Sequence, residues 1–338
     1  MAAATTVMRR TQRITGDISP KSVVASPFGL VLAQNMMYTH TVTAYRPDGA
    51  LAATIPDGVD LASFGVTGHP GTSQGAPVEA AFTSDGHHAY VSNYSMYGVG
   101  FGPEGHDSCT PSSGYDDSYT YRLDIETMKI DQAIKVGAVP KYVAVTPDDT
   151  KVLVTNWCTY DLSVIDVATA KEVQRIPIGA YPRGIVVSPD SRTAYVAVMG
   201  GDVIKRVDLV TGQASNLVGS GDAPRHILIS PDGRTLYVSH NKSNTVVRID
   251  AATGNITHSV STGAQPRSMA ISADGSAIYV VNYESSTVTK LRADDLSTLD
   301  EQPTDHHPIG ITYEPSTASV WVACYGGSIL VFDDSSPA

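Results

Sequence analysis

The sequence predicts an all-β fold of seven four-stranded antiparallel blades closed into a ring, and three observations predict it. Proline-led segments recur, the last five at a spacing of 42 residues; each continues with the same order of β-rich runs and turns; and the last copy lacks a run that the N-terminus can supply. The copies open at Pro20, Pro77, Pro140, Pro182, Pro224, Pro266 and Pro308. A closed ring of this kind is a seven-bladed β-propeller.

The copy that opens at Pro182 shows the order of elements within one repeat. Its β-rich runs fall at 184–187, 193–198, 203–207 and 214–218. A Ser-Pro-Asp-Ser turn separates the first two runs, and a second turn precedes the fourth. Four runs in a repeat of about 40 residues are typical of one propeller blade.

The seventh copy stops after its third run, close to Asp333. Near the N-terminus, the stretch Gln12-Arg-Ile parallels Gln174-Arg-Ile, which lies in the fourth run of another copy. We therefore expect residues 7–14 to complete the seventh blade, so that the ring keeps no unpaired sheet edge at its junction. The whole chain, 1–338, is then a single propeller domain.

Composition limits the classes of partner. The chain is 42% hydrophobic and 17% charged, with a net charge of −11, which fits a globular protein and argues against nucleic acid as a partner. No apolar run approaches the roughly 18–20 residues that span a bilayer, so we expect no membrane partner. The N-terminus lacks the apolar core of a secretory signal, and we expect a cytoplasmic protein, with a secreted protein whose signal has been removed as the alternative. We expect a monomer without a cofactor.

Two insertions break the regular spacing, at about 58–76 and about 95–118. Both fall in connections that a four-stranded blade places on one side of the ring, which we call the insertion face. The opposite face carries short, uniform turns. Because long loops on a rigid scaffold commonly carry function, we expect the insertion face to be the working face. The segment 95–118, rich in Gly, Ser and Tyr, is expected to act as a lid.

The lid contains His106, Asp107 and Cys109. A His-x-x-Cys pair could begin a metal site, but two ligands are too few, so we favour solvated loop residues and predict no metal site. Cys109 and Cys158 should lie on adjacent blades. They could form a disulfide that ties down the lid in an oxidising compartment; two free thiols are the alternative, which we favour.

The residue after the opening proline is basic in five of the seven copies. Ring symmetry should place these side chains around one mouth of the central channel, as a basic ring of Lys21, Lys141, Arg183, Arg225 and Arg267. Like charges held this close repel one another, and an anionic ligand would offset the repulsion, since the arginine fork suits carboxylate or phosphate. The alternative is that the arginines pair with backbone carbonyls or with acidic neighbours such as Glu79.

Further candidates surround the basic ring. At one equivalent position, four copies carry aromatic residues that could form pocket walls, or could instead pack between blades: Tyr94, Trp157, Tyr283 and Tyr325. Tyr142 follows a ring lysine and is a further candidate for binding. Glu79, His226 and His240 are candidate general acids or bases, with structural roles as the alternative for the two histidines.

Two resemblances follow from these motifs. The runs Tyr90-Val-Ser-Asn93, Tyr237-Val-Ser-His240 and Tyr279-Val-Val-Asn282 resemble those of YVTN-repeat propellers, and the resemblance covers essentially the whole chain. The stretch Pro224-Arg225-His226, followed by Tyr237-Val-Ser-His240-Asn241, resembles seven-bladed lactonases and carboxymuconate-cyclizing enzymes. That resemblance implies arginine, histidine and glutamate at the channel mouth, acting on carboxylated lactones. Arg225 and His226 match, whereas His240-Asn241 stands where the family has Asn-Glu.

Three hypotheses result. The first is a small anionic or carboxylated molecule bound by the basic ring under the lid, with metal-free acid–base chemistry: lactone hydrolysis, isomerisation or elimination. The second is a non-catalytic propeller that binds a protein, peptide or glycan through the same face. The third is a metal or redox site that uses His106, Cys109, Cys158 and His240. A pocket with a perturbed acid or base favours the first, a flat face with exposed aromatics the second, and ligands within coordination distance the third.

Overall fold

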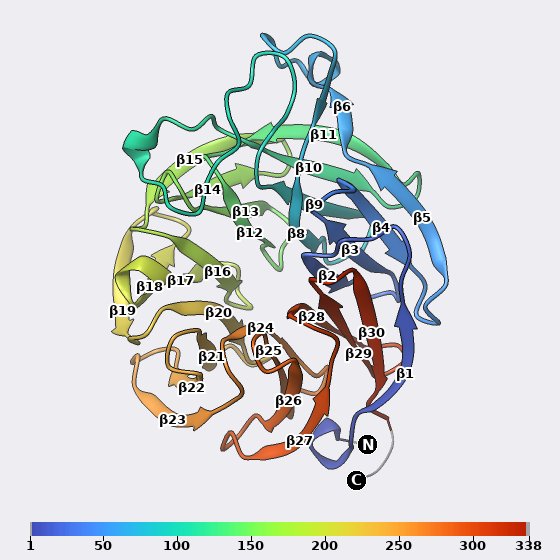
Figure 1. The fold of residues 1–338 in the computed structure, drawn as a ribbon. Coiled ribbons are helices and arrows are strands. Elements are labelled where there is room, and N and C mark those ends of the chain that lie inside the picture. The colour runs from blue at the N-terminus through green and yellow to red at the C-terminus, as the bar shows by residue number, and fades with distance from the viewer. Residues whose placement is uncertain (1, 336–338) are drawn as a thin grey trace.

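The chain folds as a ring of seven four-stranded antiparallel sheets (Figure 1). The structure is a computed structural model that describes residues 2–335. We number the blades 1 to 7 by their opening prolines. The fold class predicted from the repeat is confirmed, because each repeat forms one blade whose first strand lies innermost and whose fourth lies at the rim.

The strands of blades 1 to 4 follow the repeat. Blade 1 comprises β2 Ser22–Ala25, β3 Val31–Asn35, β4 Thr41–Tyr45 and β5 Leu51–Pro56. Blade 2 comprises β8 Pro77–Phe82, β9 His88–Asn93, β10 Tyr119–Asp124 and β11 Lys129–Lys135. Blade 3 comprises β12 Pro140–Val145, β13 Lys151–Asn156, β14 Asp161–Asp166 and β15 Lys171–Pro177. Blade 4 comprises β16 Pro182–Val187, β17 Thr193–Val198, β18 Val203–Asp208 and β19 Ala214–Gly219.

The remaining blades complete the ring. Blade 5 comprises β20 Pro224–Ile229, β21 Thr235–His240, β22 Thr245–Asp250 and β23 Ile256–Ser261. Blade 6 comprises β24 Pro266–Ile271, β25 Ala277–Asn282, β26 Thr287–Arg292 and β27 Thr298–Pro303. Blade 7 comprises β28 Pro308–Glu314, β29 Ser319–Cys324, β30 Ser328–Asp333 and, from the N-terminus, β1 Arg9–Ile14.

The tyrosines of two Tyr-Val runs, Tyr195 and Tyr237, join their blades to the next ones. The hydroxyl of Tyr195 donates to the carbonyl oxygen of Ala251 at 3.2 Å, and that of Tyr237 donates to the carbonyl oxygen of Ala293 at 3.1 Å. Both partners come just after the third strand of the following blade. The aromatic side chain of each of these tyrosines is buried among apolar neighbours, and its hydroxyl has a hydrogen-bond partner. These tyrosines therefore stabilise the packing between blades.

The ring is closed where the two ends of the chain meet. Strand β1 pairs antiparallel with β30, from Arg9 opposite Asp333 to Ile14 opposite Ile329, which confirms the predicted closure. Next to this junction, the buried ammonium of Lys290 donates to the carbonyl oxygen and the hydroxyl of Thr6 at 2.7 and 2.9 Å and to Asp334 Oδ1 at 2.6 Å. The hydroxyl of Tyr279 donates to Asp334 Oδ2 at 2.5 Å. We call this group the closure clamp, because it joins both chain ends to blade 6.

The two insertions lie together at one side of the ring (Figure 1). The first forms a small hairpin of β6 Gly58–Asp60 and β7 Thr72–Gln74, with a 3-10 turn at Leu61–Phe64 between them. The lid, residues 95–118, pairs with it through backbone hydrogen bonds between Gln74 and Tyr97 at 2.7 and 2.8 Å. Within residues 2–335, no helix is long and apolar enough to cross a bilayer.

Candidate functional site

The first strand of each blade carries the candidate residues toward the axis of the ring. In six of the seven blades the pairing between the first and second strands shifts register just after the opening proline, as between Pro140 and Tyr142 or between Pro224 and His226. A bulge of this kind re-aims a side chain. Two successive residues, such as Lys141 and Tyr142, therefore line the same space around the axis.

The five cations of the basic ring meet there, as the sequence predicts. Lys21, Lys141, Arg183 and Arg225 line one small space of about 20 Å³, and Arg267 lies beside them. Lys141 is 5% exposed and Arg225 is 9% exposed. Burial and the neighbouring cations lower the pKa of Arg183 to about 10, and they hold the pKa values of Lys21 and Arg225 well below their usual range.

Most of these cations contact aromatic rings instead of acids. Lys141 Nζ lies 4.2 Å from the ring centroid of Tyr94, and Arg267 Cζ lies 3.4 Å from that of Tyr283. The other contacts, at 5.2 to 5.8 Å, join Lys141 and Arg183 to Trp157 and Lys21 to Tyr325. All four predicted aromatic residues therefore stand over the basic ring, where a cation–π contact offsets part of the cost of burial.

One carboxylate of residues 2–335 forms an ion pair with the basic ring, and it comes from the lid. Asp107 Oδ1 lies 2.6 Å from Lys141 Nζ and accepts a hydrogen bond from the Tyr94 hydroxyl at 3.1 Å. Burial lowers the pKa of Lys141 to about 7, although Asp107 acts in the opposite direction. Burial alone would raise the pKa of Asp107, but Lys141 and Arg183 outweigh it, so that pKa lies well below its usual range. The expectation of a purely solvated lid is therefore wrong at Asp107.

A second layer lies one residue further along the first strands. There, Tyr142 Oη and His226 Nε2 are 2.8 Å apart, and His226 Nδ1 is buried without a hydrogen-bond partner in the described chain. Burial, with Arg183 and Arg225 nearby, lowers the pKa of His226 to about 3. Burial raises the pKa of Glu79 to about 8, against the opposing effects of its hydrogen bonds and of nearby cations. At neutral pH the histidine is thus uncharged and the glutamic acid is protonated.

The larger of the two spaces along the axis lies beneath the basic ring. Side chains fill the level of the ring itself, whereas a cavity of about 240 Å³ continues along the axis. Its polar lining is Ser22, Glu79, Tyr142, His226, Ser268 and Thr312, and its apolar lining includes Val24, Leu228, Met269, Ile271 and Ile311. The expected pocket directly under the lid is therefore displaced toward the interior, because five long side chains converge at the mouth.

His240 is placed apart from the other candidates. It ends β21 and contacts Thr245 on the next strand of its own blade, with His240 Nδ1 3.4 Å from the Thr245 hydroxyl. Asn156 and Asn282, at equivalent positions, also contact the third strand, where their side-chain amides donate to the hydroxyls of Ser163 and Thr289. His240 does not line the cavity, so its arrangement fits the structural alternative that the sequence left open.

The two cysteines of the insertion face form a disulfide, Cys109–Cys158, so the preference for free thiols is wrong. The lid folds back onto blade 3, and the Tyr160 hydroxyl and the Trp157 indole donate to the carbonyl oxygens of Cys109 and Asp107, each at 2.8 Å. In this state neither cysteine offers a thiolate. The metal or redox hypothesis loses two of its four ligands, and His106 is exposed with its Nδ1 accepting from the amide of Ser108.

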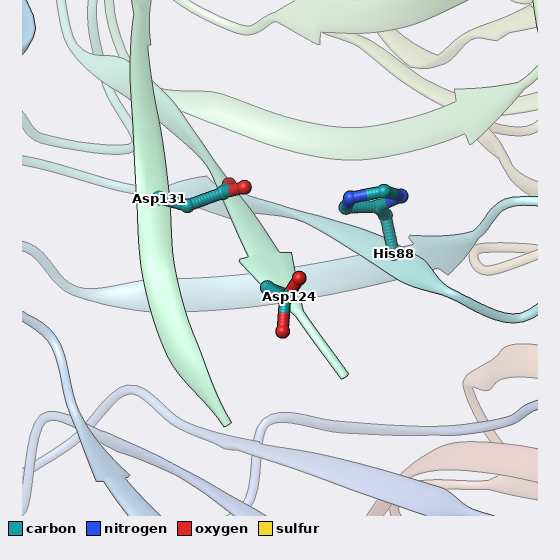
Figure 2. Close-up of side chains that lie close together, drawn as sticks. All are labelled: His88, Asp124 and Asp131. Carbon is teal, nitrogen blue, oxygen red and sulfur yellow. The ribbon is translucent and has the colours of Figure 1, made fainter. Parts of the chain in front are cut away.

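One further group of potential ligands lies on the opposite face, in blade 2. Figure 2 shows His88, Asp124 and Asp131 gathered where β9 begins and β10 ends, with ligand atoms within 4.8 Å of one another. Asp131 already accepts two hydrogen bonds from Arg122 at 2.9 and 2.7 Å, and Asp124 accepts two from Thr127 at 2.7 Å. These contacts account for both carboxylates, and we assign the group no function.

The chain matches two families of known proteins. Residues 97–264 match the family described as lactonase, 7-bladed β-propeller, and residues 211–331 match the cytochrome D1 heme domain. No curated protein matches the sequence at a significant level.

The haem in the second description does not fit this channel. The cavity of about 240 Å³ is smaller than the roughly 300–1,000 Å³ that pockets for drug-sized ligands provide. Its histidine, His226, is held by Tyr142. A macrocycle would have to displace channel side chains, and we derive no step through it.

Solved structures share the fold. A chain of hydrazine synthase from Kuenenia stuttgartiensis has 18% identity and a TM-score of 0.75, with 94% of this chain and 96% of that chain covered. A chain of the mitotic checkpoint complex has 11% identity and a TM-score of 0.76, with 97% and 92% covered. At such low identity these likenesses concern the fold alone. The architecture is that of a seven-bladed β-propeller, and residues 97–264 are similar to the seven-bladed lactonases.

Proposed function

We propose that the protein binds a small anionic or carboxylated organic molecule at the basic ring and acts on it by metal-free acid–base chemistry in the channel. The reaction classes that fit are lactone hydrolysis, isomerisation and elimination, each of which needs one proton to be donated and one to be accepted near a carboxylated carbon skeleton. The sequence similarity to seven-bladed lactonases supports the first of these.

The observation that carries the proposal is the imbalance of charge at the basic ring. Five cations share a single ion-paired carboxylate, Asp107, among the described residues. Two like charges about 8 Å apart in an effective dielectric near 20 repel by about 2 kcal/mol, and a buried charge without a partner is costly. Such an arrangement persists where a ligand supplies the missing negative charge. Arg267 Nε, which is buried without a hydrogen-bond partner in residues 2–335, is a donor that such a ligand could use.

The second layer supplies an acid and a base. Glu79, with a pKa raised to about 8, holds a proton at neutral pH and can donate it. His226, with a pKa lowered to about 3, is neutral and can accept a hydrogen bond from Tyr142 or from a bound substrate. Environments that push two pKa values apart in this way are typical of acid–base sites.

The test of binding uses thermal unfolding and calorimetry with citrate, malonate and inorganic phosphate as probes. A ligand at about 100 times its Kd should stabilise the fold by about 2.7 kcal/mol. We expect stabilisation by at least one of these anions, lost in Arg225→Met. The matched control is Arg234→Ala, which removes an exposed arginine of the same blade on the opposite face and should change nothing.

The test of catalysis follows from the anion that binds. Lactones of the same skeleton should be turned over by the wild-type protein, and Glu79→Gln should abolish turnover while leaving anion binding in place. If no probe binds to the wild-type protein, the small-molecule proposal is wrong and the insertion face should be tested for a macromolecular partner.

A further inference from the structure

A carboxylate of the lid, that of Asp107, already occupies part of the position that an anionic ligand would take at the basic ring. The carboxylate of Asp107 contacts Lys141 at 2.6 Å and the hydroxyl of Tyr94 at 3.1 Å. Its charge also acts on Arg183 and Arg225, which it does not touch. A charged hydrogen bond of this kind is among the stronger ones that a protein makes.

The lid that carries Asp107 is fastened on both sides of it. Before Asp107, the amide of Gly105 donates to Ser95 Oγ at 3.0 Å. After it, Cys109 is bonded to Cys158 of blade 3. The indole of Trp157 donates to the carbonyl oxygen of Asp107 itself. A group tethered two residues from a covalent bond has a high effective concentration at its binding site.

Only one partner of the Asp107–Lys141 ion pair, the lysine, is buried. The Lys141 side chain is 5% exposed, whereas that of Asp107 is 69% exposed. If Asp107 moves away, its carboxylate enters water without a desolvation cost, and an external anion can take its place on Lys141. In the closure clamp, by contrast, the side chains of Lys290 and Asp334 are both 0% exposed, so separating them would leave two buried charges without partners.

We propose that Asp107 is an internal ligand of the basic ring that competes with external anions, and that the Cys109–Cys158 disulfide sets the strength of this competition. The inference rests on the proposed function and adds to it a residue that determines which anions bind. A single carboxylate that is already in place excludes weak monocarboxylates, whereas an anion with two acidic groups can contact several cations at once and displace it.

The size of the effect follows from the fraction of protein in which the lid is displaced. The apparent Kd equals the intrinsic Kd divided by that fraction. If Asp107 occupies the ring about nine-tenths of the time, its removal tightens anion binding about tenfold.

The experiment measures malonate, acetate and phosphate affinities by calorimetry at pH 6.5, with the full chain. The variants are Asp107→Asn and the pair Cys109→Ser with Cys158→Ser. The control is Asp116→Asn, which removes a carboxylate of the same lid that accepts a hydrogen bond from the amide of Gly102 and does not contact the ring. Fluorescence of Trp157 reports the position of the lid, since the other tryptophan, Trp321, is fully buried in the core.

We expect Asp107→Asn to bind malonate and phosphate about tenfold more tightly and to bind acetate measurably. The cysteine pair should shift affinity in the same direction, and Asp116→Asn should match the wild type. Malonate should change Trp157 emission in the wild type but not in Asp107→Asn. Unchanged or weaker malonate binding in Asp107→Asn would overturn the competition, because Asp107 would then only hold Lys141 in position. If neither protein binds any probe through Arg225, it is the proposed function that fails.

Discussion

Two regions of the molecule bury lysine in opposite ways. In the closure clamp, Lys290 has three oxygen partners, and its carboxylate Asp334 is itself held by Tyr279. At the basic ring, Lys21, Arg183, Arg225 and Arg267 have no ion pair among residues 2–335, and Lys141 has one, with the exposed carboxylate of Asp107. Removing one partner of a buried ion pair destabilises a protein, whereas a group of cations without ion pairs indicates a place for a ligand.

The largest effect is expected at the closure clamp. Lys290→Met should lower the free energy of unfolding by about 3–5 kcal/mol, because it leaves a buried carboxylate without its partner. Equilibrium unfolding in urea measures the change. The double variant Lys290→Met with Asp334→Leu should recover most of the loss; if it is as unstable as the single variant, the clamp acts through packing and not through charge.

At the basic ring, removing a cation is expected to leave the free energy of unfolding unchanged or to raise it. Arg225→Met should leave the unliganded protein as stable as the wild type or more stable, by about 0.5–2 kcal/mol, because it removes an unpaired buried cation while keeping an apolar stem of similar length. The same urea experiment without anions tests this. A clear loss of stability would show that Arg225 is a structural residue and would weaken the contrast between the two regions.

Anion affinity should fall as pH rises from 6 to 9. Lys141 loses its proton around its pKa of about 7, and Glu79 gains a negative charge around its pKa of about 8. Both changes make the channel less positive as pH rises, so both weaken anion binding. Each lowers the affinity by up to about tenfold per pH unit. Calorimetry with malonate gives the profile. Lys141→Met should flatten its lower part and Glu79→Gln its upper part; a profile that stays level in the wild type contradicts both assignments.

The smallest effect concerns thiol chemistry. The denatured protein without reductant should show one reactive thiol, from the buried Cys324, and three after reduction. Thiol titration distinguishes these counts. Three thiols before reduction would mean that the lid is not covalently fixed, and Asp107 would then compete less strongly for the ring.

The repeat made most of the architecture predictable. Spacing between prolines located the first strand of every blade, and the tyrosines that recur with it proved to join neighbouring blades. The parallel between Gln12-Arg-Ile and Gln174-Arg-Ile located the strand that closes the ring. These predictions succeeded because the same local pattern of strands and turns occurs in every copy of the repeat. A strand that is hard to recognise in one copy can therefore be located from the others.

The contacts of the lid and of His240 could not be predicted from the repeat. Residues 95–118 have no second copy in the chain, so nothing in the sequence indicated that Asp107 would reach Lys141, and the Cys109–Cys158 disulfide was the less favoured of two alternatives. His240 shares a blade with His226, yet its side chain contacts Thr245.

The sequence by itself determined the seven blades, the closure of the ring and the meeting of five cations at its centre, because equivalent positions of a repeat become neighbours around one axis. Only the tertiary structure decided which carboxylate pairs with those cations, where the cavity opens and which of His226 and His240 lines it. The physical reason is that a bulge at the start of the first strand in six blades, and the contacts of an unrepeated lid, set the directions of individual side chains.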